Sequence, residues 1–310
     1  MPITKNTQRL QMSRNRIGAG DFTTRRGVSS AAVANAIATG LAATVLTGTA
    51  LADSYRVELN AGGLVSDQDL RTTVTDFNAS ATVYLDDVQT VDTIIAESAF
   101  LNKSSSVTLG YRDSETEQEA GAIKTKSDGD NIELNARYVQ GEKYIFEASF
   151  DDGEFDKTDV SGFGLGVGQY IDDLTTIVLN YTQQDIDSES DKRNNYSLTL
   201  KSIVDPSETD RAVGTVGVGI TQDDIANTII NLNAGLDYYF GPRFSVGGGI
   251  GLLFPNNGSD ENTYALRSQY FITKRIGVAA QYAHTIFQEE DNSTAVDASD
   301  TFELSVTGRF

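Results

Sequence analysis

The chain has 310 residues, with 44 acidic side chains against 24 basic ones, and it contains no cysteine. This acidic balance argues against nucleic acid as a partner, because phosphates require a basic face. A chain without cysteine has no disulfide framework, so its stability must come from burial and backbone pairing.

The first 52 residues are typical of a secretory signal peptide. A basic lead precedes the uncharged, small and apolar stretch from Ala31 to Gly48, and Ala50-Leu51-Ala52 matches the small-x-small cleavage pattern. We therefore expect export through a cleaved signal peptide and a mature chain that begins at Asp53. Met12 is a second candidate start, and Arg25-Arg26 raises a twin-arginine alternative, which we rank below ordinary secretion because no cofactor-binding motif follows.

The remaining residues form short runs in which apolar and polar side chains alternate, as in β-strands. We find no amphipathic helix. The fourteen runs cover residues 55–61, 77–85, 107–111, 132–138, 144–150, 163–167, 177–181, 196–200, 216–220, 230–240, 244–254, 264–272, 276–282 and 302–310. The spacing of about 18 residues per run and connection leaves room for the roughly 9 to 11 residues that a tilted membrane-spanning strand needs.

The connections between runs alternate in length. Tight turns are expected at residues 140–143, 171–174, 241–243 and 273–275, and longer acidic connections at 113–130, 185–193, 255–262 and 288–300. Outer-membrane barrels show this asymmetry, with short periplasmic turns and longer outside loops. The sequence predicts an all-β, antiparallel, up-and-down transmembrane β-barrel over residues 53–310, with about 14 strands and with 12 or 16 as alternatives.

The last run, from Thr301 to Phe310, places Phe302, Leu304, Val306 and Phe310 on one face and polar side chains on the other. We expect this strand to close the barrel against the first strand, since a sheet in lipid must lose its edges. We also expect the barrel-assembly machinery to engage the strand that ends at Phe310. Tyrosine and phenylalanine gather near the ends of many runs, as in the aromatic girdles of such barrels.

The stretch from Ala96 to Val107, AESAFLNKSSSV, resembles the stretch AEAAFLNRSSNV of a porin family of Gram-negative proteobacteria. Ser98 and Lys103 depart mildly from that pattern. The resemblance implies an outer-membrane barrel that passes small solutes, and it does not name the solute. The motif would pack as a periplasmic turn, insert into the lumen, or only shape the turn.

Charged side chains on the opposite face from the apolar ones are expected to line the pore. The pore-lining candidates are Arg56, Glu58, Asp76, Arg112, Glu133, Arg137, Glu147, Asp151, Lys201, Asp237, Arg267, Glu303 and Arg309. Opposite charges across a wet bore set a transverse field and a size limit for polar solutes. Alternatively, these groups satisfy one another and close the bore. We favour an open channel, because about fourteen strands enclose a space too wide for side chains alone to fill.

Without residues 1–52 the chain keeps 18 basic and 43 acidic side chains, a formal charge of −25. We therefore expect passive diffusion of small hydrophilic solutes with a preference for cations. The acidic segments 127–130, 151–154 and 289–292 carry carboxylates that suit Ca²⁺, but they lack the spacing of a calcium loop. Solvated charge, bridged by divalent ions to lipopolysaccharide phosphates, is the interpretation that we prefer, so no metal site is expected.

The only histidine, His284, is in phase with Tyr282 and should face lipid near an interface, away from Thr285. A hydrolase would need histidine beside a nucleophile, so we expect neither an enzyme nor a cofactor. The expected partners are outer-membrane lipid, lipopolysaccharide and small polar solutes, and a homotrimer is left open. The alternatives are a structural or adhesive barrel without an open pore and a soluble periplasmic β-sandwich that binds ligands.

Overall fold

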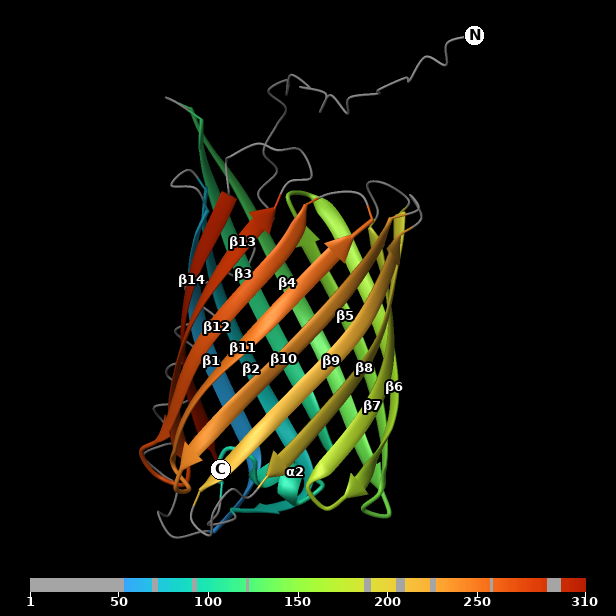
Figure 1. Ribbon diagram of the computed structural model, residues 1–310, viewed down its shortest axis with the longest axis vertical. Helices are drawn as coiled ribbons and strands as arrows, with labels where there is room; N and C mark the ends of the chain where they lie inside the picture. The colour runs from blue at the N-terminus through green and yellow to red at the C-terminus, as the bar shows by residue number, and fades with distance from the viewer. Residues whose placement is uncertain are drawn as a thin grey trace, which may run out of the picture.

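A computed structural model describes residues 53–68, 72–90, 94–120, 123–186, 191–204, 210–223, 227–256, 259–288 and 297–310. Fourteen antiparallel strands form one closed barrel, in which each strand is hydrogen-bonded to its neighbours in sequence and β14 to β1 (Figure 1). The predicted all-β barrel and its strand number are confirmed, and a single closed sheet rules out the two-sheet sandwich. The predicted signal peptide, residues 1–52, lies outside the described residues.

The strands contain 12 to 18 residues each. Their bounds are β1 Ser54–Gln68, β2 Thr72–Gln89, β3 Ser106–Ala120, β4 Ile123–Gln140, β5 Tyr144–Phe155, β6 Thr158–Asp172, β7 Thr175–Ile186, β8 Asp191–Val204, β9 Arg211–Asp223, β10 Thr228–Phe240, β11 Phe244–Pro255, β12 Asp260–Phe271, β13 Ile276–Gln288 and β14 Asp297–Arg309. One helical turn, α2 (Ser98–Leu101), lies between β2 and β3.

The last residue completes the ring. The carbonyl oxygen of Phe310 accepts hydrogen bonds from the backbone N–H groups of Arg56 and Val57, at 2.7 and 2.9 Å, and the N–H of Phe310 donates to the Val57 carbonyl. The pairing of β1 with β14 continues from Glu58 and Arg309 to the far end of both strands. The sheet therefore has no free edge at this seam, as a bilayer demands.

Large apolar side chains cover the outside of the barrel. Leu109, Leu165 and Leu266 are 55%, 59% and 61% exposed, and a soluble protein rarely exposes a continuous apolar surface of this kind. The outward aromatic rings form two contact series, Tyr238, Phe240, Phe244 and Tyr270 on β10 to β12, and Phe163, Tyr181 and Tyr196 on β6 to β8. Among the described residues, no helix is long and apolar enough to cross a membrane.

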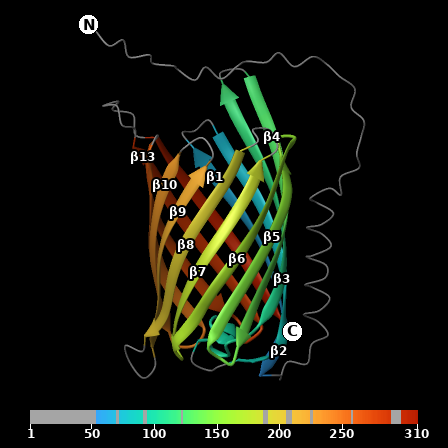
Figure 2. The same cartoon turned by 90° about the vertical axis from the view of Figure 1, so that its right-hand side faces the viewer.

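The two ends of the barrel differ. The end with the tight turns, here called the short-turn end, also holds the C-terminus and α2, which lies within the outline of the barrel in both views (Figures 1 and 2). Lys274 in the β12–β13 turn forms an ion pair with Asp53 ahead of β1, so the start of the described chain is at this end as well. The opposite end is called the long-connection end.

The expected long connection at 113–130 is wrong, because β3 and β4 continue through it as a paired hairpin. Asp113 pairs with Asp130, and the register runs on to Ala120 and Ile123, so the hairpin rises above the rim (Figure 2). Acidic segments 127–130 and 151–154 likewise lie within β4 and β5 and not in loops; segment 289–292 lies outside the described residues. Charge does not end these strands because both faces are wet above the membrane.

The alternation in the run 55–61 predicts Tyr55 on the same outer face as Val57, Leu59 and Ala61, and for Tyr55 that prediction is wrong. A register shift between Tyr55 and Val57 interrupts the pairing of β1 with β2. Tyr55 is 3% exposed and packs with Tyr84 and Val88 in a buried cluster at the short-turn end. One irregular step reverses the face of a side chain because the strand period is two residues.

Candidate functional site: the barrel lumen

Most of the charged residues predicted for the lumen form acid–base pairs there. The pairs are Arg112 with Asp76, Arg137 with Glu147 at 2.6 Å, Lys201 with Glu97 at 2.6 Å, Arg267 with Asp237 at 2.5 Å, and Arg309 with Glu58 at 2.7 Å. Glu97 was not among the predicted residues, because it belongs to the β2–β3 connection and not to a strand. A lumen that holds such pairs has charges of both signs on its wall.

Three of the carboxylates predicted for the lumen lack a basic partner within the part of the chain that the structure describes. Glu133 on β4 lies directly across from Asp151 on β5, so two acids are neighbours. Glu303 on β14 lies across from Gln281 and Leu64. These three carboxylates are not neutralised by an ion pair with the described residues.

Arg56 is placed apart from the other candidates. It lies at the irregular start of β1, where its guanidinium forms an ion pair with Asp87 and donates to the Leu85 carbonyl. The two charged side chains are 58% and 60% exposed. The structure therefore puts Arg56 at the rim of the short-turn end, and the role of the remaining candidates in permeation stays a prediction.

Glycines on the inner face of β6 give the neighbouring polar side chains room. A Cβ atom at Gly164 would lie 2.3 Å from the Ser149 hydroxyl, and one at Gly166 would lie 2.1 Å from the Asn180 side-chain oxygen. Side chains from β5 and β7 thus lie over a strand that has none of its own here. Strand glycines of this kind mark a close approach of neighbouring groups, and a cavity of about 420 Å³ borders this part of the wall.

The β2–β3 connection folds into the barrel at the short-turn end. We call residues 94–105 the inner loop. Ile94 packs against Ile203, Val213 and Tyr239 on the inner faces of β8, β9 and β10. This contact is dry, since Ile94 is fully buried.

The opposite side of the inner loop packs just as closely. Phe100 contacts the cluster of Ile145, Tyr170 and Val178 on β5, β6 and β7, and its ring centroid is 5.5 Å from that of Tyr170. Ala99 contacts the cluster that contains Tyr55. The inner loop therefore spans the bore from one wall to the other, as the resemblance allowed for this motif when it offered insertion into the lumen.

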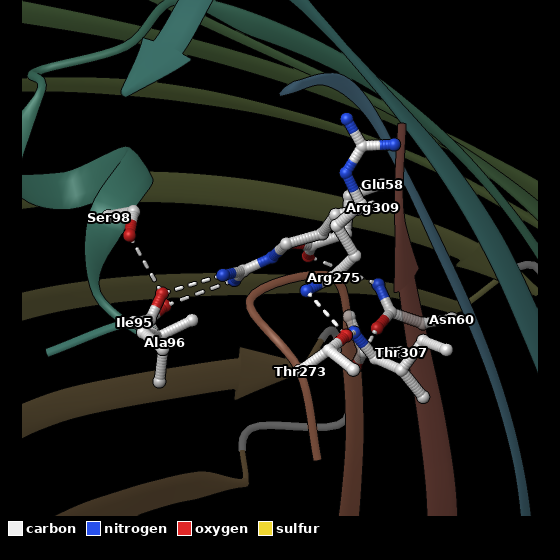
Figure 3. Close-up of polar contacts among 10 residues, drawn as sticks. Glu58, Asn60, Ile95, Ala96, Ser98, Thr273, Arg275, Thr307 and Arg309 are labelled. Carbon is white, nitrogen blue, oxygen red and sulfur yellow. Dashed lines mark hydrogen bonds and ion pairs between the residues drawn. The ribbon is translucent and has the colours of Figure 1, made fainter. Parts of the chain in front are cut away.

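Arg309 joins the end of the chain to the inner loop. Its side chain is 4% exposed, and its guanidinium donates to the carbonyl oxygens of Ile95 and Ala96, at 2.6 and 3.4 Å, as well as to Glu58 (Figure 3). The rings of Tyr55 and Phe271 lie on it, with centroids 4.6 and 4.7 Å from the guanidinium carbon. Charge, hydrogen bonds and two aromatic faces together hold this cation.

Two lysines hold the inner loop at other points. Lys201 pairs with Glu97 and lies 4.8 Å from the centroid of the Phe100 ring. Lys103 donates to Asp173 in the β6–β7 turn at 2.7 Å, and this bond raises the pKa of Lys103 and lowers that of Asp173. The inner loop is thus tied to turns and strands around the whole circumference.

Asn102, in the stretch from Ala96 to Val107, has a structural role. Its side-chain amide donates to the carbonyls of Gln89 and Ser98, and its side-chain oxygen accepts from the Gln89 N–H. The side chain thereby joins the end of β2 to the helical turn α2. A residue with one donor group and one acceptor suits this position.

The alternation pattern does not predict the inward apolar residues at the short-turn end. Ile145, Ile203 and Phe271 are at most 3% exposed, although strict alternation assigns them to a wet face. A clue was present, because each stands beside an outward apolar residue, as in Tyr144-Ile145-Phe146 and Phe271-Ile272. Unbroken apolar runs are typical of strands that are covered on both faces.

Open space remains on both sides of Glu97. A cavity of about 300 Å³ is lined by Glu97, Asp237, Arg267 and Glu303, among others. A second, of about 400 Å³, lies between the inner loop and the wall that carries Arg137 and Lys201. The inner loop therefore narrows the lumen and leaves polar crevices beside it.

His284 lies on the outer face at the long-connection end, as predicted. Its Nδ1 atom is 2.8 Å from the Asp300 carboxylate, which also accepts from the Tyr282 hydroxyl at 2.6 Å. Within the described ranges, no group of three or more His, Cys, Asp or Glu side chains is placed to hold a metal ion.

Solved structures share this architecture. The outer membrane protein Omp33 of Acinetobacter baumannii is 17% identical, with a TM-score of 0.58 over 84% of this chain and 100% of that one. A bacterial polysaccharide outer membrane secretin is 10% identical, with a TM-score of 0.55 over 83% and 99%. A mutant of the monoaromatic hydrocarbon channel TodX is 10% identical, with a TM-score of 0.50 over 86% and 94%.

The fold is that of an outer-membrane β-barrel. The likeness is one of architecture, because the identities are low, and it agrees with the resemblance of the 96–107 stretch to a porin family. A scan of protein-family models finds no match, and a search of curated proteins finds none.

Proposed function

We propose that the protein is an outer-membrane porin, a channel for passive diffusion of small hydrophilic solutes that prefers cations. The apolar outer surface and the polar lumen support a barrel that spans the membrane around a wet bore. The observation that carries the cation preference is the set of three lumen carboxylates, Glu133, Asp151 and Glu303, that have no basic partner among the described residues.

The proposed path runs from the long-connection end, outside the cell, to the short-turn end in the periplasm, because short turns of such barrels face the periplasm. Solutes pass the wide part of the lumen beside the β6 glycines and then the crevices next to Glu97. The inner loop sets the size limit, and the three unpaired carboxylates along the lumen set the charge preference.

The test is conductance of the purified protein in planar bilayers with a salt gradient. We expect a reversal potential of the sign that indicates cation flow, and a shift toward zero in the double variant E133Q/D151N. Glu117 on the exposed hairpin provides the control, since E117Q removes a charge outside the lumen and should leave the potential unchanged. An anion-selective channel, or an equal shift in E117Q, would contradict the cation preference.

A second candidate function is a structural or adhesive barrel without an open pore. The dense packing of Ile94, Phe100 and Arg309 across the short-turn end favours it. The two functions differ in one result: a structural barrel gives no conductance until the inner loop is removed, whereas a porin conducts with the inner loop in place.

We further propose export to the outer membrane of a Gram-negative bacterium through a signal peptide cleaved before Asp53, with lipid and lipopolysaccharide around the barrel and no catalytic role. Assembly would use the strand that ends at Phe310. Terminal sequencing of the mature protein should begin at Asp53. An intact barrel should shift on gels when it is boiled, and a protein soluble without detergent would refute the location.

A further inference from the structure

The wall on one side of the inner loop carries a row of polar residues that follows the hydrogen-bonding direction across neighbouring strands. Strand pairing places Asp237 opposite Gly247, Gly247 opposite Arg267, Arg267 opposite Gln281, and Gln281 opposite Glu303, across β10 to β14. Adjacent strands are about 4.8 Å apart, so the Cα atoms of Arg267 and Glu303 are roughly 10 Å apart. The row borders the cavity of about 300 Å³.

One end of the row offers a fixed guanidinium. Arg267 donates from Nε and from Nη2 to the two oxygens of Asp237, each at 2.5 Å. The guanidinium has five N–H groups, so three remain without a protein acceptor in the described structure. The side chain is 40% exposed, and its free donors are available to an anionic group in the cavity.

Glycines make room for this pair. A Cβ atom at Gly247 would lie 1.9 Å from Oδ1 of Asp237, and one at Gly235 would lie 3.2 Å from Nη2 of Arg267. Asp237 and Arg267 therefore meet over the bare backbone of β11. Because the carboxylate fixes the plane of the guanidinium, the free donors keep one orientation.

The other end of the row offers a free carboxylate. Glu303 has no hydrogen bond or ion pair with the described residues, and it lies across from Gln281. Ser305 follows it on the same face of β14 and also lines the cavity. A cation in the cavity would thus find an anionic partner, with an amide and a hydroxyl beside it.

We propose that this row is a binding site for small zwitterions, molecules that carry one carboxylate and one ammonium group, as amino acids do. The carboxylate of the solute accepts from the free N–H groups of Arg267, and its ammonium donates to Glu303, while Gln281 between them can bond to either group. The cavity is at the lower end of the volumes of small-molecule sites, about 300 to 1,000 Å³. This inference rests on the proposed channel function and names a solute class for it.

The experiment measures uptake of radiolabelled L-alanine by proteoliposomes as a function of concentration. Ethylamine and propionate are the competitors, since each matches alanine without one of its two charged groups. We expect saturable uptake, with each competitor at least about tenfold weaker than unlabelled alanine, as the loss of a charge-assisted contact implies.

Variants separate the two ends of the row. E303Q should raise the half-saturating alanine concentration about tenfold. The double variant D237N/R267Q removes the other end without leaving a lone buried charge, and it should make ethylamine as good a competitor as alanine. E133Q, which removes an equivalent lumen carboxylate on β4, should shift the reversal potential and leave the alanine saturation unchanged.

The possible results distinguish this site from the channel itself. Uptake that never saturates, in a protein that conducts ions, overturns the zwitterion site and leaves the channel intact. Ethylamine that competes as well as alanine with the unmodified protein also overturns it, since Glu303 would then be a simple cation site. A protein that passes neither ions nor solutes refutes the proposed function, and the site falls with it.

Discussion

The two ends of the lumen are built by the same strands and have opposite interiors. Along the inner face of β5, the side chains run from Ile145, which is fully buried, through Glu147 and Ser149 to Asp151. The inner face of β8 runs in the same way from Ile203 to Lys201 and Thr199. At one end the barrel encloses a small apolar core around the inner loop, and at the other its inner face carries polar side chains. The alternation of apolar and polar residues specifies which side chains face outward. Whether the inner face is solvated or packed depends on which other segments lie against it inside the barrel.

The largest expected effect comes from removing the inner loop. Replacing residues 86–104 with Asn-Gly would join Leu85 to Ser105, whose backbones are already hydrogen-bonded, by a turn that suits a two-residue hairpin. We expect single-channel conductance to rise severalfold, because the short-turn end would become as open as the other. An unchanged conductance would show that the inner loop is not the narrowest point.

The next effect concerns the charge that holds the inner loop. R309Q removes the cationic partner of Glu58, whose side chain is 16% exposed, and breaking a largely buried ion pair costs about 3 to 5 kcal/mol. We expect a matching loss in the free energy of unfolding, measured with denaturant in lipid. K126Q breaks the pair with Glu115 on the hairpin, where both side chains are half exposed, and should cost far less, because solvent screens an exposed pair. Equal losses would refute the contrast.

The apolar contacts provide a third comparison. Phe100→Ala removes the ring that packs on Ile145, Tyr170 and Val178, and we expect a loss of about 3 kcal/mol in unfolding free energy. Phe163 faces lipid and contacts only the edge of the Tyr181 ring within its aromatic series. Phe163→Ala should therefore cost only about 1 kcal/mol. A larger loss for Phe163 would mean that the inner loop adds little to stability.

The smallest effect is a pH dependence at the rim. The hydrogen bond from Lys103 lowers the pKa of Asp173, so its contribution is present above the unfolded pKa of aspartate, near 3.9, and is lost as pH falls through the lowered value. The raised pKa of Lys103 acts in the opposite direction, since that contribution is lost as pH rises through it. The interaction is complete between about pH 5 and 9.

Hydrogen exchange of the inner-loop amides should show this window as a loss of protection at acid pH, relative to the intrinsic exchange rate at the same pH. Asp173 is almost fully exposed, so the change is small. D173N should remove both limbs of the profile, because the raised pKa of Lys103 and the lowered pKa of Asp173 come mainly from the same bond. Exchange rates that follow only the intrinsic chemistry at every pH would contradict the predicted role of this pair.

Much of the wall follows from the sequence, because alternation is a local property. The runs around Phe163 and Leu165 show their outward side despite the surrounding glycines, and the strand that ends at Phe310 closes on β1 as expected. The length of β3 and β4 did not follow, since strand pairing continues beyond the bilayer where neither face need be apolar. The predicted outward position of Tyr55 was wrong because one irregular step in the pairing of β1 with β2 reverses the face of its side chain.

The site was only partly predictable for a different reason. The charged residues of the lumen could be named from their phase, but their partners could not, because Lys201 pairs with Glu97 on a connection and not with a strand. The inner loop had a clue in Ile94, Ile95, Phe100 and Leu101, four large apolar residues in a turn that water should surround. Such residues need a dry place, and the lumen is the one that the fold provides.

The position of Arg309 has a consequence for biogenesis. Its partners Glu58 and Ile95 are 251 and 214 residues earlier in the chain, and contacts of such long sequence separation form late. The hydrogen bonds from Arg309 to the inner loop can form only after the final strand has docked beside the first. A nascent barrel therefore lacks these contacts until it is complete. Losing the last two residues would remove both the backbone pairing at Phe310 and the contacts of Arg309 with the inner loop.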